Sequence, residues 1–167
     1  MRLVHTITAL AVVGLITTAA ALAVGPTSVT KTGGLHFVGN PDVTATKNAN
    51  EAFLTGTGEV AGAGPTATAS LSADVDVTRG CINRGSKDQQ PSGLQRSFTT
   101  TSGSTTFQTR SGRGTFNVET SPHITATPFK CPDQMTPVLV SVTFTNVTLT
   151  VSSQTGTTTA TFPDIDP

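Results

Sequence analysis

The chain has 167 residues, of which only 12% are charged, and its 10 basic and 10 acidic side chains leave no net charge. This balance argues against a nucleic-acid or membrane-surface partner, because such partners attract strongly basic proteins. The sequence holds no Trp and no Tyr, which excludes a sugar-binding platform built on either residue. Its length suits one domain with a substantial core.

Residues 1–23 predict a secretion signal. A short polar start is followed by the apolar stretch "ITALAVVGLITTAAALA", and Ala21-Leu22-Ala23 places small residues where a signal peptidase cleaves. The apolar stretch is short for a membrane span, which takes roughly 20 residues. We therefore expect a secreted, extracellular protein that begins near Val24 and has no membrane anchor once the signal is removed.

A small, polar segment follows at 24–34, which we expect to be flexible. Residues 35–167 predict a single all-β domain, because apolar residues alternate there with Thr, Ser and charged residues. Short strands are expected near 35–38, 43–46, 53–61 and 124–126. The clearest alternation is "ATASLSADVDV" at 67–77, which places Asp74 and Asp76 on the solvent face.

The next segment, "RSFTTTSGSTTFQTR", is interpreted as a β-hairpin. A two-residue turn at Ser102-Gly103 would pair Phe98 with Phe107 on one apolar face. A second tight turn is expected at "SGRG", residues 111–114, and leads into another strand.

The strongest strand pattern is "VLVSVTFTNVTLTV" at 138–151, where the apolar phase slips by one residue near Thr145-Asn146. The slip indicates a β-bulge, or a strand that crosses between sheets. A last strand is expected at 157–162. Many short strands with regular turns predict an antiparallel β-sandwich of immunoglobulin-like architecture.

The cysteines, Cys81 and Cys131, predict one disulfide, because an even pair in a small secreted domain is usually bonded. In the chain-entropy model such a crosslink contributes roughly 4 kcal/mol. The histidines after the signal, His36 and His123, have no ligand cluster around them in the sequence, so neither a metal nor a cofactor is expected.

Basic side chains are concentrated around one predicted loop, 80–94. The predicted hairpin leaves this loop and returns, which would gather six basic residues at one end of the sheet. The six candidate binding residues are Arg79, Arg84, Lys87, Arg96, Arg110 and Arg113. Arginine binds carboxylates and phosphates in pairs of hydrogen bonds, so the end predicts an anionic cell-wall polymer or protein as partner. Alternatively, the charges only keep the loops soluble.

Motifs for catalysis are missing from the sequence. It contains no GxSxG, no HExxH and no phosphate-cradling glycine loop, so we expect no enzyme and no catalytic residue. The Asp74/Asp76 and Asp164/Asp166 pairs are interpreted as solvated carboxylates rather than calcium ligands.

Four features together resemble a known group of proteins: the short signal, the Thr-rich all-β body, "TRGCINRG" followed by "GLQR", and "MTPVLVSVTFTNVTLTV". The chain resembles small secreted proteins of actinomycetes to which no activity is assigned. The resemblance implies an extracellular bacterial setting, in which Asn146 of the Asn-Val-Thr acceptor motif stays unglycosylated. It transfers no functional residue.

The leading hypothesis is a secreted, non-enzymatic sandwich that binds an anionic surface partner through its basic loop end. One alternative is an extracellular protease inhibitor that presents the 82–96 loop, with Arg84 entering a trypsin-like pocket. Another is a structural or assembly role through the edges of Thr-rich strands.

Overall fold

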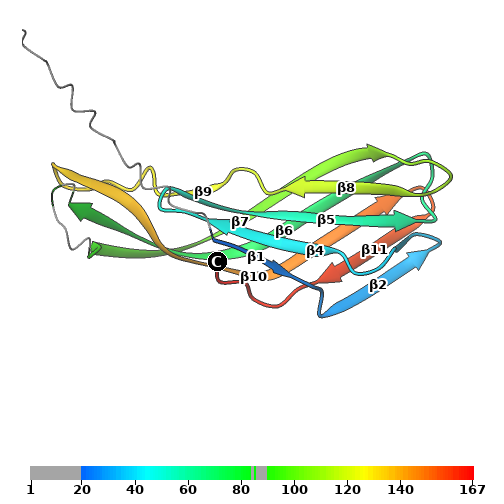
Figure 1. Ribbon diagram of the computed structural model, residues 1–167, viewed down its shortest axis with the longest axis horizontal. Helices are drawn as coiled ribbons and strands as arrows, with labels where there is room; N and C mark the ends of the chain where they lie inside the picture. The colour runs from blue at the N-terminus through cyan, green and yellow to red at the C-terminus, as the bar shows by residue number, and fades with distance from the viewer. Residues whose placement is uncertain (1–19, 84, 86–89) are drawn as a thin grey trace, which may run out of the picture.

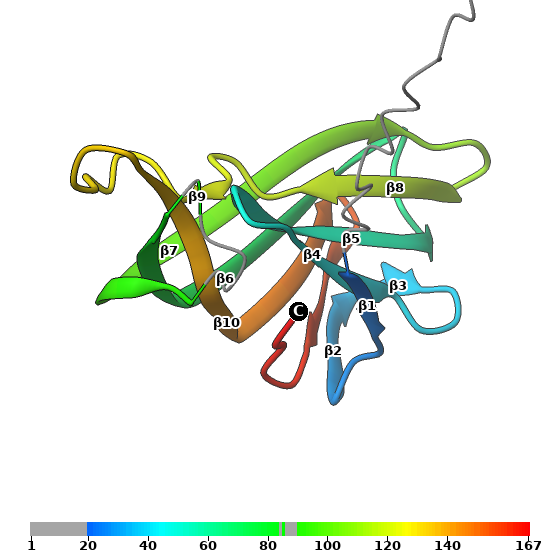
Figure 2. The ribbon, with the colours of Figure 1, turned by 60° about the vertical axis from the view of Figure 1, so that its left-hand side comes forward.

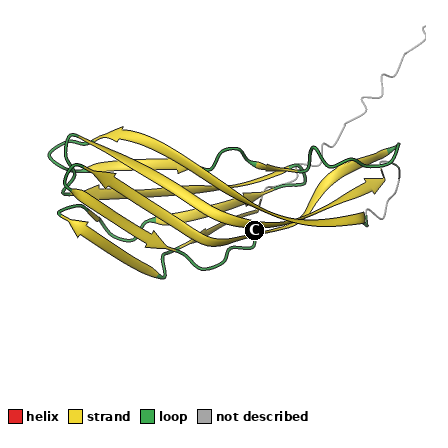
Figure 3. Cartoon of the chain, turned by 180° about the vertical axis from the view of Figure 1, so that it is seen from behind, coloured by secondary structure: helices red, strands yellow, loops and turns green. Residues whose placement is uncertain are grey.

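The computed structural model describes residues 20–83, 85 and 90–167. Its strands are β1 (Ala20–Val24), β2 (Ser28–Gly33), β3 (His36–Phe37), β4 (Asp42–Lys47), β5 (Glu51–Ala61), β6 (Thr66–Asn83), β7 (Ser92–Gln108), β8 (Gly114–Glu119), β9 (Ile124–Thr125), β10 (Met135–Ser153) and β11 (Gly156–Thr161). Figure 3 shows that these strands make up most of the domain. Among the described residues, no helix is long and apolar enough to cross a bilayer.

The strands form two antiparallel sheets that pack face to face (Figure 1). One sheet has the order β2-β11-β10-β6-β7, and the other has the order β1-β4-β5-β3, with β8 and β9 also paired to β5. At Gly56 of β5 the sheets are so close that an added Cβ would lie 3.3 Å from the Leu149 side chain and 3.5 Å from Leu71. The predicted all-β sandwich with one disulfide is therefore confirmed.

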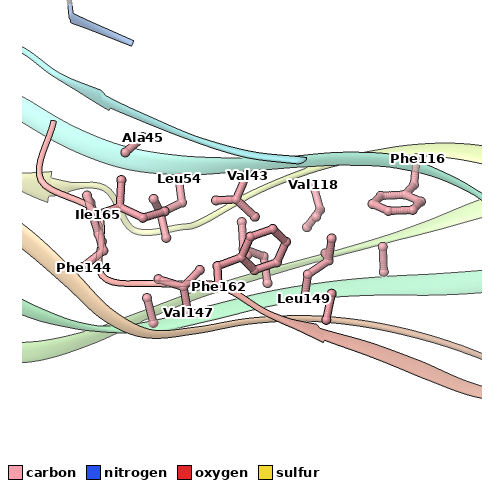
Figure 4. Close-up of a cluster of buried hydrophobic side chains, with 14 of the residues drawn as sticks. Val43, Ala45, Leu54, Phe116, Val118, Phe144, Val147, Leu149, Phe162 and Ile165 are labelled. Carbon is pink, nitrogen blue, oxygen red and sulfur yellow. The ribbon is translucent and has the colours of Figure 1, made fainter. Parts of the chain in front are cut away.

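β6 is an interior strand of the five-stranded sheet, and it pairs with β7 on one side and β10 on the other along nearly its whole length. Its odd-numbered residues from 67 to 77 are buried, as the alternation predicts. Figure 4 shows the core between the sheets, where Val118 of one sheet lies next to Leu149 of the other. Burial of this continuous apolar layer supplies the main stabilising term of such a fold.

The expected β-bulge in β10 is confirmed. Its pairing with β6 slips between Thr145 and Thr148, and Asn146 adopts a positive φ of 52°. The extra residue turns the strand so that Phe144, Val147 and Leu149 are all fully buried, although their spacing breaks strict alternation.

The expected hairpin at Ser102-Gly103 is wrong. Instead, β7 is one unbroken strand that pairs with β6 from Gln108 at one end to Ser92 at the other. Phe98 consequently points to solvent, with 74% of its surface exposed. Phe107 packs on the opposite face, with its ring centroid 5.8 Å from that of Phe116.

Gly103 has a different role from the turn that we predicted. A Cβ at this position would overlap the carbonyl oxygen of Glu119, which belongs to the other sheet. The neighbouring Ser102 carbonyl accepts a hydrogen bond of 2.8 Å from the Ser121 amide. The glycine therefore permits a close backbone approach between the sheets, which is its other common use within a strand.

The N-terminal segment 24–34, expected to be flexible, contains the edge strand β2, which pairs with β11 over all six of its residues. Its six side chains are exposed. The predicted cleavage site after Ala23 lies within β1, which pairs with β4. The strand β4 also packs on the core through its inward side chains, Val43 and Ala45, which are fully buried.

The disulfide joins Cys81 in β6 to Cys131, with their Cα atoms 5.7 Å apart. It lies at the end where β6, β7 and β10 extend beyond the other strands (Figure 1). The strands also shorten the expected loop of 80–94, since β6 continues to Asn83 and β7 begins at Ser92.

The Gly103→Ala substitution tests the close approach directly. Since the added methyl meets backbone rather than a movable side chain, we expect it to lower the free energy of unfolding by about 2–4 kcal/mol. Chemical denaturation measures the change. Gly25→Ala is the matched control, because a Cβ there has open space around it. Equal stability of the two variants would contradict the packing.

Candidate functional site

In the described part of the chain, the predicted basic residues are divided between the two ends of the sheet. Because β7 is unbroken, Arg96 lies near its start, whereas Arg110 follows its end. The two residues are therefore separated by roughly 45 Å of extended strand. Arg110 and Arg113 flank the confirmed tight turn, where their backbones pair with each other at the far end of the sheet.

Two of the other basic residues are engaged within the protein. Arg79 is half-buried and donates from Nε to the Thr125 carbonyl (2.9 Å) and from a terminal nitrogen to the Ser97 hydroxyl (2.9 Å). It thus ties the disulfide end of β6 to β9. Arg113 pairs with Glu59 at 3.0 Å.

Arg84 and Lys87 lie outside the described residues. The geometry therefore tests neither the contribution of these two residues to an anionic site nor the role of Arg84 as the inhibitory residue. Arg110 and Arg113 line a groove of about 370 Å³, and Arg79 lines one of about 280 Å³. Arg96 instead contacts Asp76 and Phe98, which line a third groove.

That groove lies on the solvent face of the five-stranded sheet, over β10, β6 and β7, and has a volume of about 500 Å³. We call it the Phe98 groove. Figure 2 shows the twist of these three strands. The groove is lined by Asp74, Val75, Asp76, Phe98, Thr99, Thr100, Thr143 and Thr145. Its size is typical of ligand sites, which span roughly 300–1,000 Å³.

The exposed ring of Phe98 is held by its neighbours. The Arg96 guanidinium carbon lies 5.0 Å from the centre of the ring, in a cation–π contact. Arg96 is fixed in turn by Asp76, whose two carboxylate oxygens accept hydrogen bonds from Nε at 2.8 and 2.9 Å. This bonding holds the pKa of the Asp76 carboxyl below its ordinary value and raises the pKa of Arg96. The aromatic surface is therefore preorganised.

The second carboxylate, Asp74, is held from the β-bulge. Asn146 donates from its side-chain amide to Asp74 Oδ2 at 2.8 Å. The positive φ of Asn146 belongs to the bulge, so the irregularity that keeps the core continuous also brings a polar group to the groove. Within the described residues, the other oxygen of Asp74 has no partner and is available to a ligand.

Threonine hydroxyls in the groove differ from those elsewhere on the same sheet face. Away from the groove they pair across strands, Thr68 with Thr106 at 3.0 Å and Thr150 with Thr159 at 3.1 Å. In the described part of the chain, three hydroxyls of the groove lack any such hydrogen bond. They belong to Thr100, Thr143 and Thr145.

A second polar group lies on the other sheet, around His123. Its ring stacks on Phe53 at 4.3 Å, and the protonated ring donates from Nδ1 to Glu51 (3.0 Å) and from Nε2 to Glu119 (2.9 Å). The hydrogen bond with Glu51, followed by the bond and charge of Glu119, raises the pKa of His123 above its ordinary value of 6.5. Both ring nitrogens are occupied, so the arrangement stabilises strands rather than presenting a free ligand.

One feature of the groove was predictable from the sequence and another was not. The alternation in β6 correctly places Asp74 and Asp76 on the solvent face. The predicted hairpin assigned Phe98 to the core, so the aromatic member was missed. Continuation of period-2 alternation through Gly103 was the pattern that would have placed it outside.

Comparison with known proteins adds no family assignment: no family model, curated protein or solved structure matches the chain. The resemblance to secreted actinomycete proteins stays a prediction. The proposed function therefore depends on the geometry of the chain itself.

The His123 group predicts a pH dependence of stability. Because its pKa is raised on folding, its stabilising contribution is fully present below about pH 6.5 and is lost as the pH rises through the folded-state value. We expect the difference in melting temperature between wild type and His123→Asn to be larger at about pH 5.5 than at about pH 8.5. His36→Asn is the control, since among the described residues its ring has no carboxylate partner and pairs with the Gly34 carbonyl. A pH-independent difference for His123 would contradict the assignment.

Proposed function

We propose that the chain is a secreted, non-enzymatic binding protein that contacts cell-surface material through the Phe98 groove. The observation that carries this proposal is the exposed Phe98 ring, held by Arg96 over a groove that contains carboxylates and unpaired hydroxyls. Exposed aromatic side chains that are rigidly held are typical of binding surfaces, because covering them releases water at small entropic cost.

The chemistry of the carboxylates favours binding over catalysis. A general acid or base works best with a pKa near the working pH and with a free path to the substrate. The pKa of Asp76 is instead lowered by Arg96, and both of its oxygens accept hydrogen bonds from that residue. Asp76 therefore acts here as a fixed charge that positions Arg96.

An extracellular location is supported by the disulfide between Cys81 and Cys131. Disulfides persist in oxidising compartments and are rare in the cytosol. The predicted signal at 1–23 is consistent with the same location, and its first 19 residues lie outside the described part of the chain.

The charge of the groove argues against a strongly anionic partner. Asp74 and Asp76 face the ligand space, and the positive charge of Arg96 is already paired. An anionic polymer would thus meet uncompensated negative charge here. The earlier anionic-partner hypothesis now depends on Arg84 and Lys87, and the inhibitor and assembly alternatives stay predictions.

A retention assay tests the proposed function. Chain 24–167 is incubated with purified bacterial cell envelopes, and the bound fraction is measured. We expect Phe98→Ser to reduce retention by about tenfold, because the change removes the aromatic surface. Leu94→Ser is the matched control, since Leu94 is another exposed apolar residue of β7, at 61%, but does not line the groove.

A third variant separates the two binding hypotheses. The double substitution Arg84→Ser and Lys87→Ser removes the basic side chains that lie outside the described residues. We expect its retention to equal that of wild type. Retention that is lost in this variant but kept in Phe98→Ser would overturn the groove and favour the basic loop.

A further inference from the structure

We infer that the Phe98 groove binds a neutral glycan chain. This inference rests on the proposed function, because it names the ligand class for the same groove. It is carried by the regular placement of one aromatic ring, two carboxylates and three free hydroxyls on the face of a sheet.

The groups lie in two rows that cross the three strands. Strand register places Phe98, Asp76 and Thr143 side by side in one row, and Thr100, Asp74 and Thr145 in the next. Neighbouring strands are roughly 4.8 Å apart, and rows two residues apart are separated by roughly 6.7 Å. The polar side chains of the groove are therefore spaced a few ångströms apart in both directions. This spacing suits a ligand that carries hydroxyl groups at similar distances.

Each part of this surface matches one part of a sugar. A pyranose ring has apolar C–H faces and a polar edge of hydroxyls. Arg96 covers one face of the Phe98 ring, which leaves the other face for a sugar ring to stack on. Carboxylates accept strong hydrogen bonds from hydroxyls, and threonine hydroxyls both donate and accept. The free oxygen of Asp74 and the three unpaired threonines thus supply the polar partners.

The unpaired hydroxyls distinguish the groove from the remaining sheet surface. The Thr68–Thr106 and Thr150–Thr159 pairs satisfy each other. In the groove, carboxylate-bearing β6 lies between the threonines of β7 and β10, so those threonines do not face one another. Water can hydrate them in the free protein, and a ligand with both donors and acceptors can replace that water.

Charge and strand pairing decide between ligand classes. Since Arg96 neutralises Asp76, the remaining charge of Asp74 disfavours phosphate or uronate groups and leaves neutral sugars. An extended peptide binds most readily by adding to a free strand edge. The free edge beside the groove is that of β7, and a strand added there would extend the sheet without covering Asp74 or Thr145 on its face. A neutral glycan therefore fits better than a peptide.

Affinity gel electrophoresis tests the ligand class, with hydroxyethyl cellulose, soluble starch, galactomannan and dextran as separate probes. We expect at least one to retard chain 24–167. For that probe, Phe98→Ala should weaken binding about tenfold or more, whereas Phe98→Tyr should retain it. Thr145→Val should weaken it several-fold, and Thr68→Val, which removes a paired hydroxyl away from the groove, should not. Melting temperatures confirm that each variant is folded.

Three outcomes would overturn the inference. The first is equal affinity of wild type and Phe98→Ala for a probe that binds. The second is that no probe retards the protein, while envelope retention still depends on Phe98 and disappears after the envelopes are treated with protease. In that case the ligand is a protein, and the proposed function stays intact. The third is the absence of both glycan binding and envelope retention, which removes the proposed function as well.

Discussion

The structure depends on β6 being hydrogen-bonded along both of its edges. This strand pairs with β7 and β10 from the turns at one end of the sandwich to the disulfide at the other. Its inward face forms the centre of the core, and its outward face carries the groove carboxylates, Asp74 and Asp76. Because alternate residues of one strand serve the two faces, the packing that stabilises the fold also fixes the spacing of the candidate site.

Two local features of the strands beside β6 determine how the groove and the contact between the sheets are built. The bulge at Asn146 lets β10 keep its apolar residues inward on both sides of the slip, and it directs an amide to Asp74. Gly103 lets the backbone of β7 pass against Glu119 of the other sheet. The first feature builds part of the groove, and the second lets β7 continue unbroken past the other sheet.

Much of the fold was predictable because period-2 alternation reports directly on burial. The strand at 67–77, the slip near Asn146 and the Cys81–Cys131 disulfide are all confirmed. The Ser102-Gly103 turn was wrong because glycine serves two purposes, a turn and a close backbone approach, and only the distant segment near Glu119 decides between them. The same limit hid the His123 group, whose partner Glu51 lies far away in the sequence.

The candidate site changed for the same reason. A hairpin would have gathered Arg96 and Arg110 and produced a basic end, whereas an unbroken strand separates them and exposes Phe98. A hairpin at this position would have produced a basic anion site, whereas the unbroken β7 produces an aromatic groove. The proposed function therefore depends on the course of this one strand.

A distance across β7 tests this account most directly. Spin labels at Gln95→Cys and Gln108→Cys, both exposed positions, allow the separation to be measured by pulsed electron resonance. An unbroken strand predicts roughly 40 Å between the labelled backbones. A separation of roughly 10 Å or less, as expected for facing strands of a hairpin, would contradict the account.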